Sequence, residues 1–272
     1  MKVTVFCDLT ETSETFFQSL ANWIPSQCEQ VTLVHCLESM LPPGSPMEAH
    51  GNHIAELKSR KYSELQALCE KLPYSTHIRV AEKSPPEVIK EESRLQLNRK
   101  SDLIIFGLYR KSSVERILTG TTGEGIINES KVPCLGLPVE KSSEFMHTWM
   151  LALRSTDPLN EPALISLTQL YKERLKRIAA VSILSGPGAP EAWDRQLAEL
   201  CARLPVDASY EILHSDDPAT RLQEFASEPQ SSPVILQRRK RTWKEEVFGP
   251  VLSRSFLFGA GQPVFFLPQV HQ

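Results

Sequence analysis

The sequence predicts an α/β protein of two tandem domains, each with a mainly parallel five-stranded sheet flanked by helices. Strand-like runs alternate with helical patterns along the chain, which is typical of parallel sheets covered on both faces. The order of elements in the first half returns in the second, and 272 residues suit two domains of ordinary size. We therefore expect an N-terminal domain of residues 1–140 and a degenerate C-terminal domain of residues 141–272.

The first half contains five runs rich in β-branched and apolar residues, separated by helical patterns. The expected strands are residues 2–9, 31–38, 76–82, 101–107 and 132–138. The expected helices are residues 16–24, 57–72, 85–97, 114–118 and 123–130. The first helix follows Asp8 and the N-cap residue types Thr10, Thr12 and Ser13. Each strand thus feeds a helix, as a parallel sheet requires.

The second half shows the same succession. Its expected strands are residues 148–155, 177–184, 208–213, 232–237 and 262–268. Its expected helices are residues 162–175, 191–204 and 218–226. Adding 130 to the residue number carries 101–107 onto 231–237 and 132–138 onto 262–268 without a gap. One period of this size indicates tandem domains rather than a solenoid.

Composition and charge exclude several classes of partner. The apolar content of 41% and charged content of 23% describe an ordered globular protein. The net charge of -3 gives no general attraction to nucleic acid or to anionic membranes. No apolar run reaches the roughly 18 residues of a membrane span, and the N-terminus turns acidic before a signal sequence could form. We expect a cytoplasmic protein without nucleic-acid or membrane partners.

The residues that usually carry chemistry are scattered. The six cysteines occur singly, without a C-x-x-C pair, which indicates small buried side chains in a reducing compartment rather than disulfides or zinc ligands. The histidines have no metal-ligand spacing, so we expect no metal site. No nucleophile motif is present either. We expect no catalytic residues and a protein that is not an enzyme.

Residues 107–122, GLYRKSSVERILTGTT, join an apolar strand to the last helix of the first half. Unpaired backbone N–H groups and the helix dipole favour an anion at a helix N-terminus. Glycine lets a phosphate come close to the backbone. Gly107, Gly120, Thr121 and Thr122 fit these needs, and the threonines add hydroxyl donors. The stretch therefore has the residues of a phosphate-binding loop.

The first half resembles a universal stress protein domain, and the whole chain resembles the tandem form of that family. The resemblance rests on the first strand ending in Asp8, the strand LVHC ending at Cys36, the strand DLIIFG, and the loop spacing G-x2-R-x9-G-T. It implies a Rossmann-like, adenine nucleotide alpha hydrolase-like fold. It also implies an intramolecular pseudo-dimer of the two halves through their last strands, with a homodimer left open.

For function, the resemblance implies a role in stress survival or signalling without a defined chemical transformation. Some members of the family bind ATP or AMP and others do not. Where a nucleotide is bound, Asp8 and the backbone near Cys36 are implied to face the adenosine. These strand ends are where open α/β sheets place ligands.

Arg110 stands where the family loop, G-x2-G-x9-G-[ST], has its second glycine. An arginine in the left-handed conformation costs about 1–2 kcal/mol, so we expect the loop to take another path. Its guanidinium could then contact phosphate oxygens, which would make Arg110 part of an ATP or AMP site. The alternative is a solvated turn in which Gly120 serves packing only. That alternative describes a nucleotide-free scaffold or interaction protein with the same fold.

The second half has lost the residues of this loop. Gln237, Pro250 and Val251 stand 130 residues after the two glycines and the first threonine. Proline lacks an N–H group and valine resists positive φ. Arg154 stands where the first half has Asp8. We expect no nucleotide site of this design in the C-terminal half.

Overall fold

The computed structural model describes residues 1–9, 13–37, 47–94, 102–108, 122–154, 158–184, 191–217, 220–221, 224, 232–238 and 261–270. The strands of the N-terminal half are β1 (Lys2–Phe6), β2 (Gln30–Cys36), β3 (Thr76–Ala81), β4 (Leu103–Leu108) and β5 (Cys134–Pro138). Its helices are α1 (Ser13–Trp23), α2 (Met47–Cys69), α3 (Pro85–Arg94) and α5 (Thr122–Glu129). The expected helix at residues 114–118 lies outside the described residues.

The C-terminal half follows the same succession. Its strands are β6 (Thr148–Leu153), β7 (Arg177–Leu184), β8 (Asp207–His214), β9 (Val234–Gln237) and β10 (Val264–Leu267). Its helices are α6 (Glu161–Leu170) and α7 (Glu191–Arg203). The expected helix at residues 218–226 lies largely outside the described residues.

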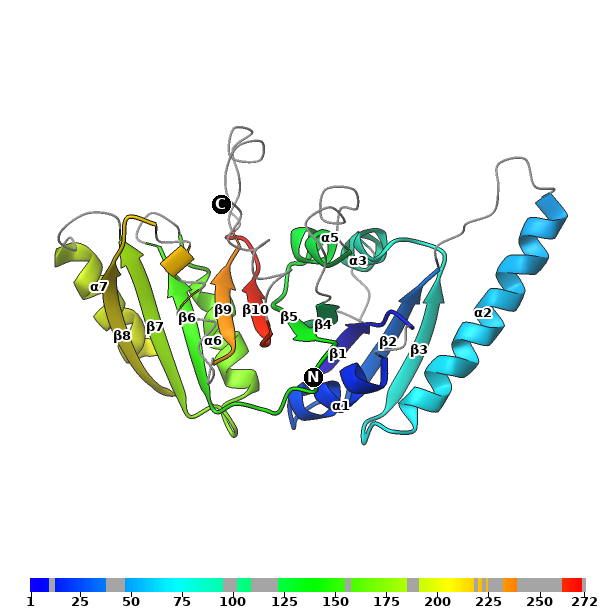
Figure 1. The fold of residues 1–272 in the computed structure, drawn as a ribbon, viewed down its shortest axis with the longest axis horizontal. Coiled ribbons are helices and arrows are strands. Elements are labelled where there is room, and N and C mark those ends of the chain that lie inside the picture. The colour runs from blue at the N-terminus through cyan, green and yellow to red at the C-terminus, as the bar shows by residue number, and fades with distance from the viewer. Residues whose placement is uncertain are drawn as a thin grey trace.

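The ten described strands form one continuous sheet in the order β3-β2-β1-β4-β5-β10-β9-β6-β7-β8 (Figure 1). Neighbouring strands are parallel within each half, and β5 and β10 pair antiparallel, with Gly136 opposite Val264. Read outwards from that pair, the two halves have the same strand order. The predicted fold class is confirmed, and the halves join through their last strands as the resemblance implied.

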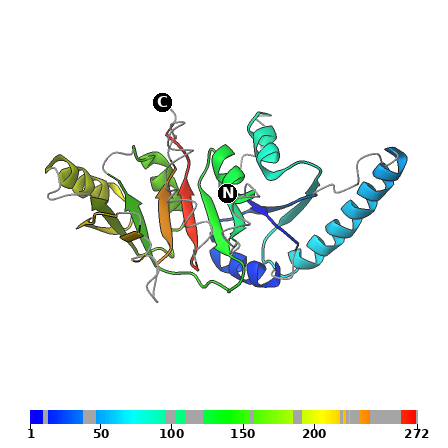
Figure 2. The ribbon, with the colours of Figure 1, turned by 45° about the horizontal axis from the view of Figure 1, so that its top comes forward.

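Helices cover both faces of the sheet (Figure 2). Side chains of α1, α2, α6 and α7 pack in one core, and those of α3 and α5 pack in the other. Alternation along the strands supplies both cores, since Val3 and Val5 face the first while Phe6 faces the second. Each core contains residues of both halves. The molecule therefore has two layers of core that run across the junction.

Five aromatic side chains fill the junction between the halves. They are Trp23, Phe145, Trp149, Tyr171 and Phe265, and the closest ring centroids, those of Trp149 and Phe265, lie 4.4 Å apart. The hydroxyl of Tyr171 donates to the carbonyl of Trp23 at 2.6 Å. Large aromatic side chains contribute strongly to core energetics, so this cluster helps to hold the two halves together.

Polar contacts join the C-terminal ends of α1 and α6. Nη1 of Arg174 donates to the carbonyl of Asn22 at 2.7 Å, and Oγ of Ser26 donates to Oε2 of Glu173 at 2.7 Å. The expected helix at residues 162–175 was wrong in its extent, because α6 ends at Leu170 and the chain turns at Tyr171. The turn gives Tyr171 and the two charged residues to the junction instead of to a helix surface.

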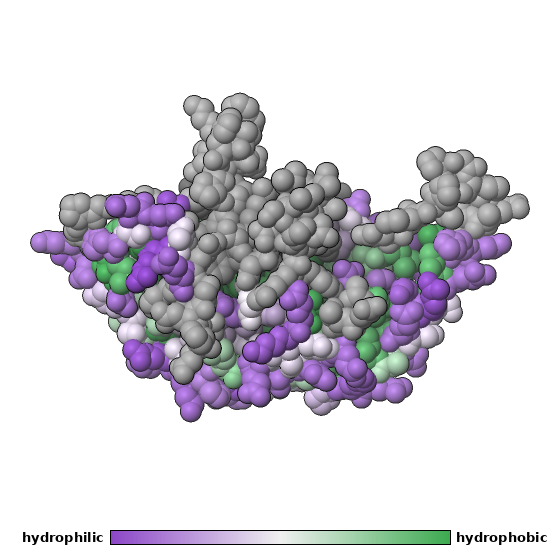
Figure 3. Space-filling model, in the orientation of Figure 1, coloured by the Kyte–Doolittle hydropathy of each residue, from purple (hydrophilic) through white to green (hydrophobic). Residues whose placement is uncertain are grey.

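The surface seen in Figure 3 is mostly hydrophilic, with small apolar areas beside α2 and beside α7. Among the described helices, none combines the length and apolar character that a membrane crossing requires. All six cysteines are free thiols, and Cys7, Cys69 and Cys134 are buried.

Candidate functional site

The candidate site lies at the carboxyl ends of β1, β2 and β4. In the N-terminal half the strand order reverses between β1 and β4, because the chain first builds β2 and β3 on one side and then β4 and β5 on the other. Open α/β sheets bind ligands outside the carboxyl ends of the strands at this switch point. Asp8 follows β1, and Gly107 lies near the end of β4.

The register of the sheet brings Asp8 and Cys36 together. Phe6 pairs with Val34 on one side and with Phe106 on the other. Carried two residues further, this register places Asp8 between Cys36 and Leu108, at strand spacings of about 4.8 Å. Gly107 lies one residue earlier on β4 and faces the other side of the sheet, as its partner Leu137 does. Three of the predicted residues thus gather at one edge.

Asp8 and Cys36 differ in their environment. The side chain of Asp8 is exposed, whereas that of Cys36 is half-buried. Burial raises the pKa of the Cys36 thiol to about 12, Arg79 opposes this rise, and the carboxylates of Asp8 and Glu87 add to it. The thiol is therefore protonated at neutral pH and is not a nucleophile. The exposed side chain at this strand end is the carboxylate of Asp8.

His35 supports this edge and was given no role in the sequence analysis. Its ring is buried, and Nδ1 lies 2.9 Å from the carbonyl oxygen of Cys7. Because a carbonyl oxygen only accepts, Nδ1 carries the hydrogen. The contact ties the end of β1 to β2 directly before Asp8. The only sequence signal for it is a polar residue at the end of a buried strand.

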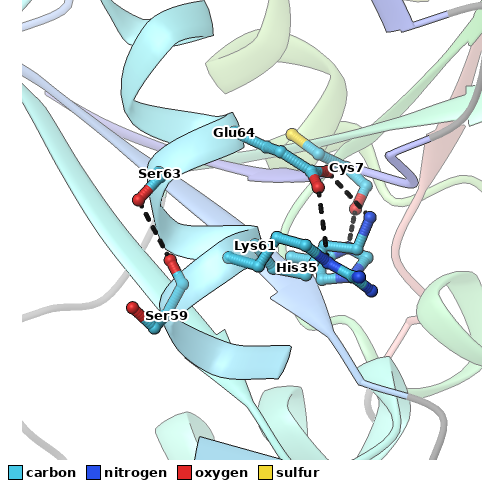
Figure 4. A network of polar contacts seen from close by, with 7 residues as sticks. Cys7, His35, Ser59, Lys61, Ser63 and Glu64 are labelled. Atoms are coloured by element: carbon cyan, nitrogen blue, oxygen red, sulfur yellow. Dashed lines mark hydrogen bonds and ion pairs between the residues drawn. The ribbon is translucent and has the colours of Figure 1, made fainter. Parts of the chain in front are cut away.

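Figure 4 shows the contact between His35 and Cys7 together with the polar side chains of α2. Nζ of Lys61 donates to Oε2 of Glu64 at 2.7 Å, and Oγ of Ser63 donates to the carbonyl of Ser59 at 3.1 Å. Residues three or four positions apart lie on one side of a helix, and the Lys61–Glu64 pair stabilises α2 modestly. These contacts lie within α2, whereas the contact of His35 joins β2 to the end of β1.

The loop residues are placed only in part. Thr122 begins α5, which agrees with the expectation that it stands at the start of the last helix of the half. Arg110, Gly120 and Thr121 lie outside the described residues. The predicted phosphate loop between Gly107 and Thr122 therefore stays a prediction. Within the part of the chain that is described, no group of His, Cys, Asp and Glu side chains could hold a metal ion.

The register also identifies the equivalent edge of the second half. Thr4 pairs with Ile104, and Met150 pairs with Val234, which stands 130 residues after Ile104. Thr4 and Met150 are therefore equivalent, and four residues further on, just beyond the end of each strand, Arg154 takes the place of Asp8. The replacement inferred from the sequence is thus confirmed by the strand pairing.

In the second half, Gln237 stands at the position equivalent to Gly107, and its side chain makes hydrogen bonds there. Oε1 of Gln237 accepts from the backbone N–H of Asn160 at 2.8 Å, and Nε2 donates to the carbonyl of Pro268 at 3.1 Å. Asn160 also caps α6, because its Oδ1 accepts from the N–H of Ala163 at 3.1 Å. The sequence analysis missed Asn160, although asparagine before Glu-Pro is a helix-start signal. Intramolecular contacts thus occupy this edge.

Residues 1–138 of the chain match the model of the universal stress protein family. The chain belongs to this family. The matched part of the universal stress protein ends with β5, so it spans the N-terminal half with its exposed Asp8. A search of curated proteins found no match.

Solved structures resemble the universal stress protein over both halves. A universal stress protein from Archaeoglobus fulgidus has a TM-score of 0.70 at 15% identity, with 98% of this chain and 96% of that chain covered. A functionally unknown protein from Pseudomonas aeruginosa PAO1 has a TM-score of 0.56 at 13% identity, covering 98% and 92%. The cytoplasmic domain of a prokaryotic cation chloride cotransporter has a TM-score of 0.53 at 14% identity, covering 98% and 95%. At these identities the likeness shows the fold alone.

Proposed function

We propose that this universal stress protein binds ATP or AMP in its N-terminal half only, and that it acts in the stress response as a binding protein rather than an enzyme. The observation that carries the proposal is the difference between the two equivalent edges. In the first half an exposed Asp8 lies beside Cys36 at the switch point of the sheet. In the second half Arg154 replaces Asp8, and Gln237 fills the place of Gly107.

The residues of the first half fit an adenine nucleotide. An ionised carboxylate only accepts hydrogen bonds, so Asp8 suits the hydroxyl and amino donors of an adenosine. The phosphates would extend from Gly107 toward the start of α5 at Thr122, where the helix dipole and unpaired N–H groups favour negative charge. Arg110 would add a guanidinium to the phosphate end, as proposed from the sequence.

The location and the partners are part of the same proposal. Six free thiols in one chain suit a reducing compartment, which supports the cytoplasm. The degenerate C-terminal half would serve as a permanent structural partner, because it already occupies the β5 edge through which another copy could pair. A homodimer would then have to use another surface.

A nucleotide-free scaffold is the second candidate function. The observation that favours it is Arg110, which stands in a loop position where the family has glycine. In that case the protein would act through protein contacts alone. The two candidates differ in one measurable property, the binding of nucleotide.

The first test is nucleotide binding by the whole protein. We expect mass spectrometry of the denatured protein to find ATP or AMP, or thermal melts to show stabilisation by added nucleotide. Binding at a hundred times Kd adds about 2.7 kcal/mol to the free energy of unfolding. If no nucleotide is released and neither ATP nor AMP shifts the melt, the scaffold function replaces the proposal.

The second test separates the two halves. We expect Asp8→Ala to weaken ATP or AMP binding about 10- to 100-fold in calorimetric titrations, because a hydrogen bond to a charged group is worth about 1.5–3 kcal/mol. Arg154→Ala changes the equivalent exposed residue of the other half and should leave the affinity unchanged. A loss of affinity in the Arg154 variant alone would place the site in the C-terminal half.

A further inference from the structure

Arg238 of the C-terminal half contacts a helix of the N-terminal half. Its Nη1 donates to the carbonyl oxygen of Ile127 at 2.9 Å. Ile127 belongs to the last four residues of α5, whose carbonyl groups have no partner within the helix. The last turn of α5 contains no basic residue of its own. Arg238 therefore supplies both a hydrogen bond and a positive charge where the helix dipole is negative.

The sheet determines that Arg238 reaches α5. Its backbone N–H donates to the carbonyl of Leu267 at 3.2 Å, which continues the pairing of β9 with β10. Its side chain leaves the sheet on the same face as Leu236, which is the face covered by α5. Strand β5, which α5 contacts, lies two strand spacings from β9, roughly 10 Å. An extended arginine side chain spans most of that distance.

Among the residues that the structure describes, this contact has no counterpart at the equivalent position of the N-terminal half. Residue 108 of the first half is equivalent to residue 238, because β4 and β9 match with an offset of 130. Leu108 stands there, and its side chain is apolar and buried. It therefore cannot cap a helix of the other half. The C-terminal half supports α5 through Arg238, and the equivalent residue of the N-terminal half makes no such contact with a helix of the C-terminal half.

We propose that Arg238 is a positioning residue through which the C-terminal half holds α5 in place beside the nucleotide site. Helix α5 begins at Thr122, the last residue of the predicted phosphate loop, so a shift of the helix moves the end of that loop. The C-terminal half has lost the residues of a nucleotide site but keeps a role in building the other one. This inference rests on the proposed function, since α5 borders the site proposed there.

Hydrogen exchange tests the cap without any ligand. Arg238→Met keeps an unbranched apolar stem and removes the cap, so the amides of residues 122–129 should exchange about tenfold faster than in the wild type. Arg238→Lys keeps the charge and should restore part of the protection. Arg203→Met is the matched control, because it removes the half-exposed pair with Glu161 far from α5 and should leave these amides unchanged.

Titration with ATP and with AMP tests the link to the site. Arg238→Met should raise the Kd severalfold, and Arg203→Met should not change it. Unchanged exchange in α5 would overturn the inference, and so would faster exchange with an unchanged Kd. If the wild type binds neither nucleotide, the proposed function fails by itself, and the exchange data still decide whether Arg238 holds α5.

Discussion

The buried hydroxyl of Tyr171 forms a hydrogen bond across the junction between the two halves. Its ring lies in the aromatic cluster, and its hydroxyl donates to the carbonyl of Trp23 at 2.6 Å. Burial raises the pKa of Tyr171 well above its ordinary value, with the charge of Arg174 opposing the rise. The hydroxyl therefore stays protonated in the folded protein at pH values where a tyrosine of the unfolded chain ionises.

Tyr171→Phe should lower the free energy of unfolding at pH 7 by about 1–3 kcal/mol, because the buried carbonyl of Trp23 loses its donor. The raised pKa adds stability that is complete below pH 10 and is lost as the pH rises further, since only the unfolded chain then releases the proton. The variant should lose less stability between pH 9 and 11 than the wild type, as measured by urea unfolding.

Tyr62→Phe is the control for this prediction, because Tyr62 is 47% exposed on α2. It should leave the stability at pH 7 unchanged. If Tyr171→Phe behaves like Tyr62→Phe, the hydroxyl of Tyr171 contributes nothing to the junction.

The pair of helices α3 and α5 depends on one close approach. A Cβ atom built on Gly125 of α5 would lie 2.4 Å from Cγ of Pro86, in the first turn of α3. The proline ring is rigid, so the helices would have to move apart. Gly125 thus sets the distance between the two helices that cover this face of the sheet. Helix α2, by contrast, contains Gly51 in open surroundings, with no atom near its missing Cβ.

Gly125→Ala and Gly51→Ala should therefore have opposite effects. Both gain up to about 1 kcal/mol of helix propensity. Gly125→Ala also overpacks the contact with Pro86 at a cost of about 1–3 kcal/mol, so it should destabilise the protein in thermal or urea unfolding. Gly51→Ala should stabilise it. Equal stabilisation by both changes would show that α3 and α5 are not held together by this contact.

At the scale of the whole molecule, the two halves share their cores. Phe265 of β10 lies fully buried against Trp23 of the first half and Trp149 of the second. Phe106 and Phe266 stack across the junction on the other face, with ring centroids 6.4 Å apart. Because both layers of core cross the β5–β10 pair, neither half can unfold without exposing apolar surface of the other.

We expect the protein to unfold in a single calorimetric transition. Phe265→Ala should lower its stability by about 3–5 kcal/mol without splitting the transition. Phe17→Ala, which removes a buried ring from the N-terminal half, should also give one transition at lower temperature. Two transitions in either variant, or a calorimetric enthalpy above the van't Hoff value, would show that the halves unfold independently.

The strand-end residues of the candidate site could be predicted from the sequence, because a strand end is a local pattern, whereas the loop between Gly107 and Thr122 stays a prediction. Asp8, Cys36 and Gly107 were expected at strand ends, and the structure places them there. His35 was missed because its partner, the carbonyl of Cys7, lies on a neighbouring segment of the sheet that is distant in the chain. Asn160 has a local helix-start signal that was not used, and its contact with Gln237 joins segments far apart in the chain. The extent of α6 was misjudged for the same reason, as contacts with α1 accompany the turn at Tyr171.

The sequence by itself determined the alternation of strands and helices, the duplication, and the loss of Asp8 and Gly107 equivalents from the second half. Periodicity and register along one chain carry this information, because burial repeats with the period of each element. Only the tertiary structure decided that the halves share one sheet and that Arg238 caps α5. It also decided that the side chain of Gln237 bonds to Asn160 at the sheet edge of the second half. A sequence pattern shows which face of an element is buried, but the residue that lies opposite depends on how distant elements pack.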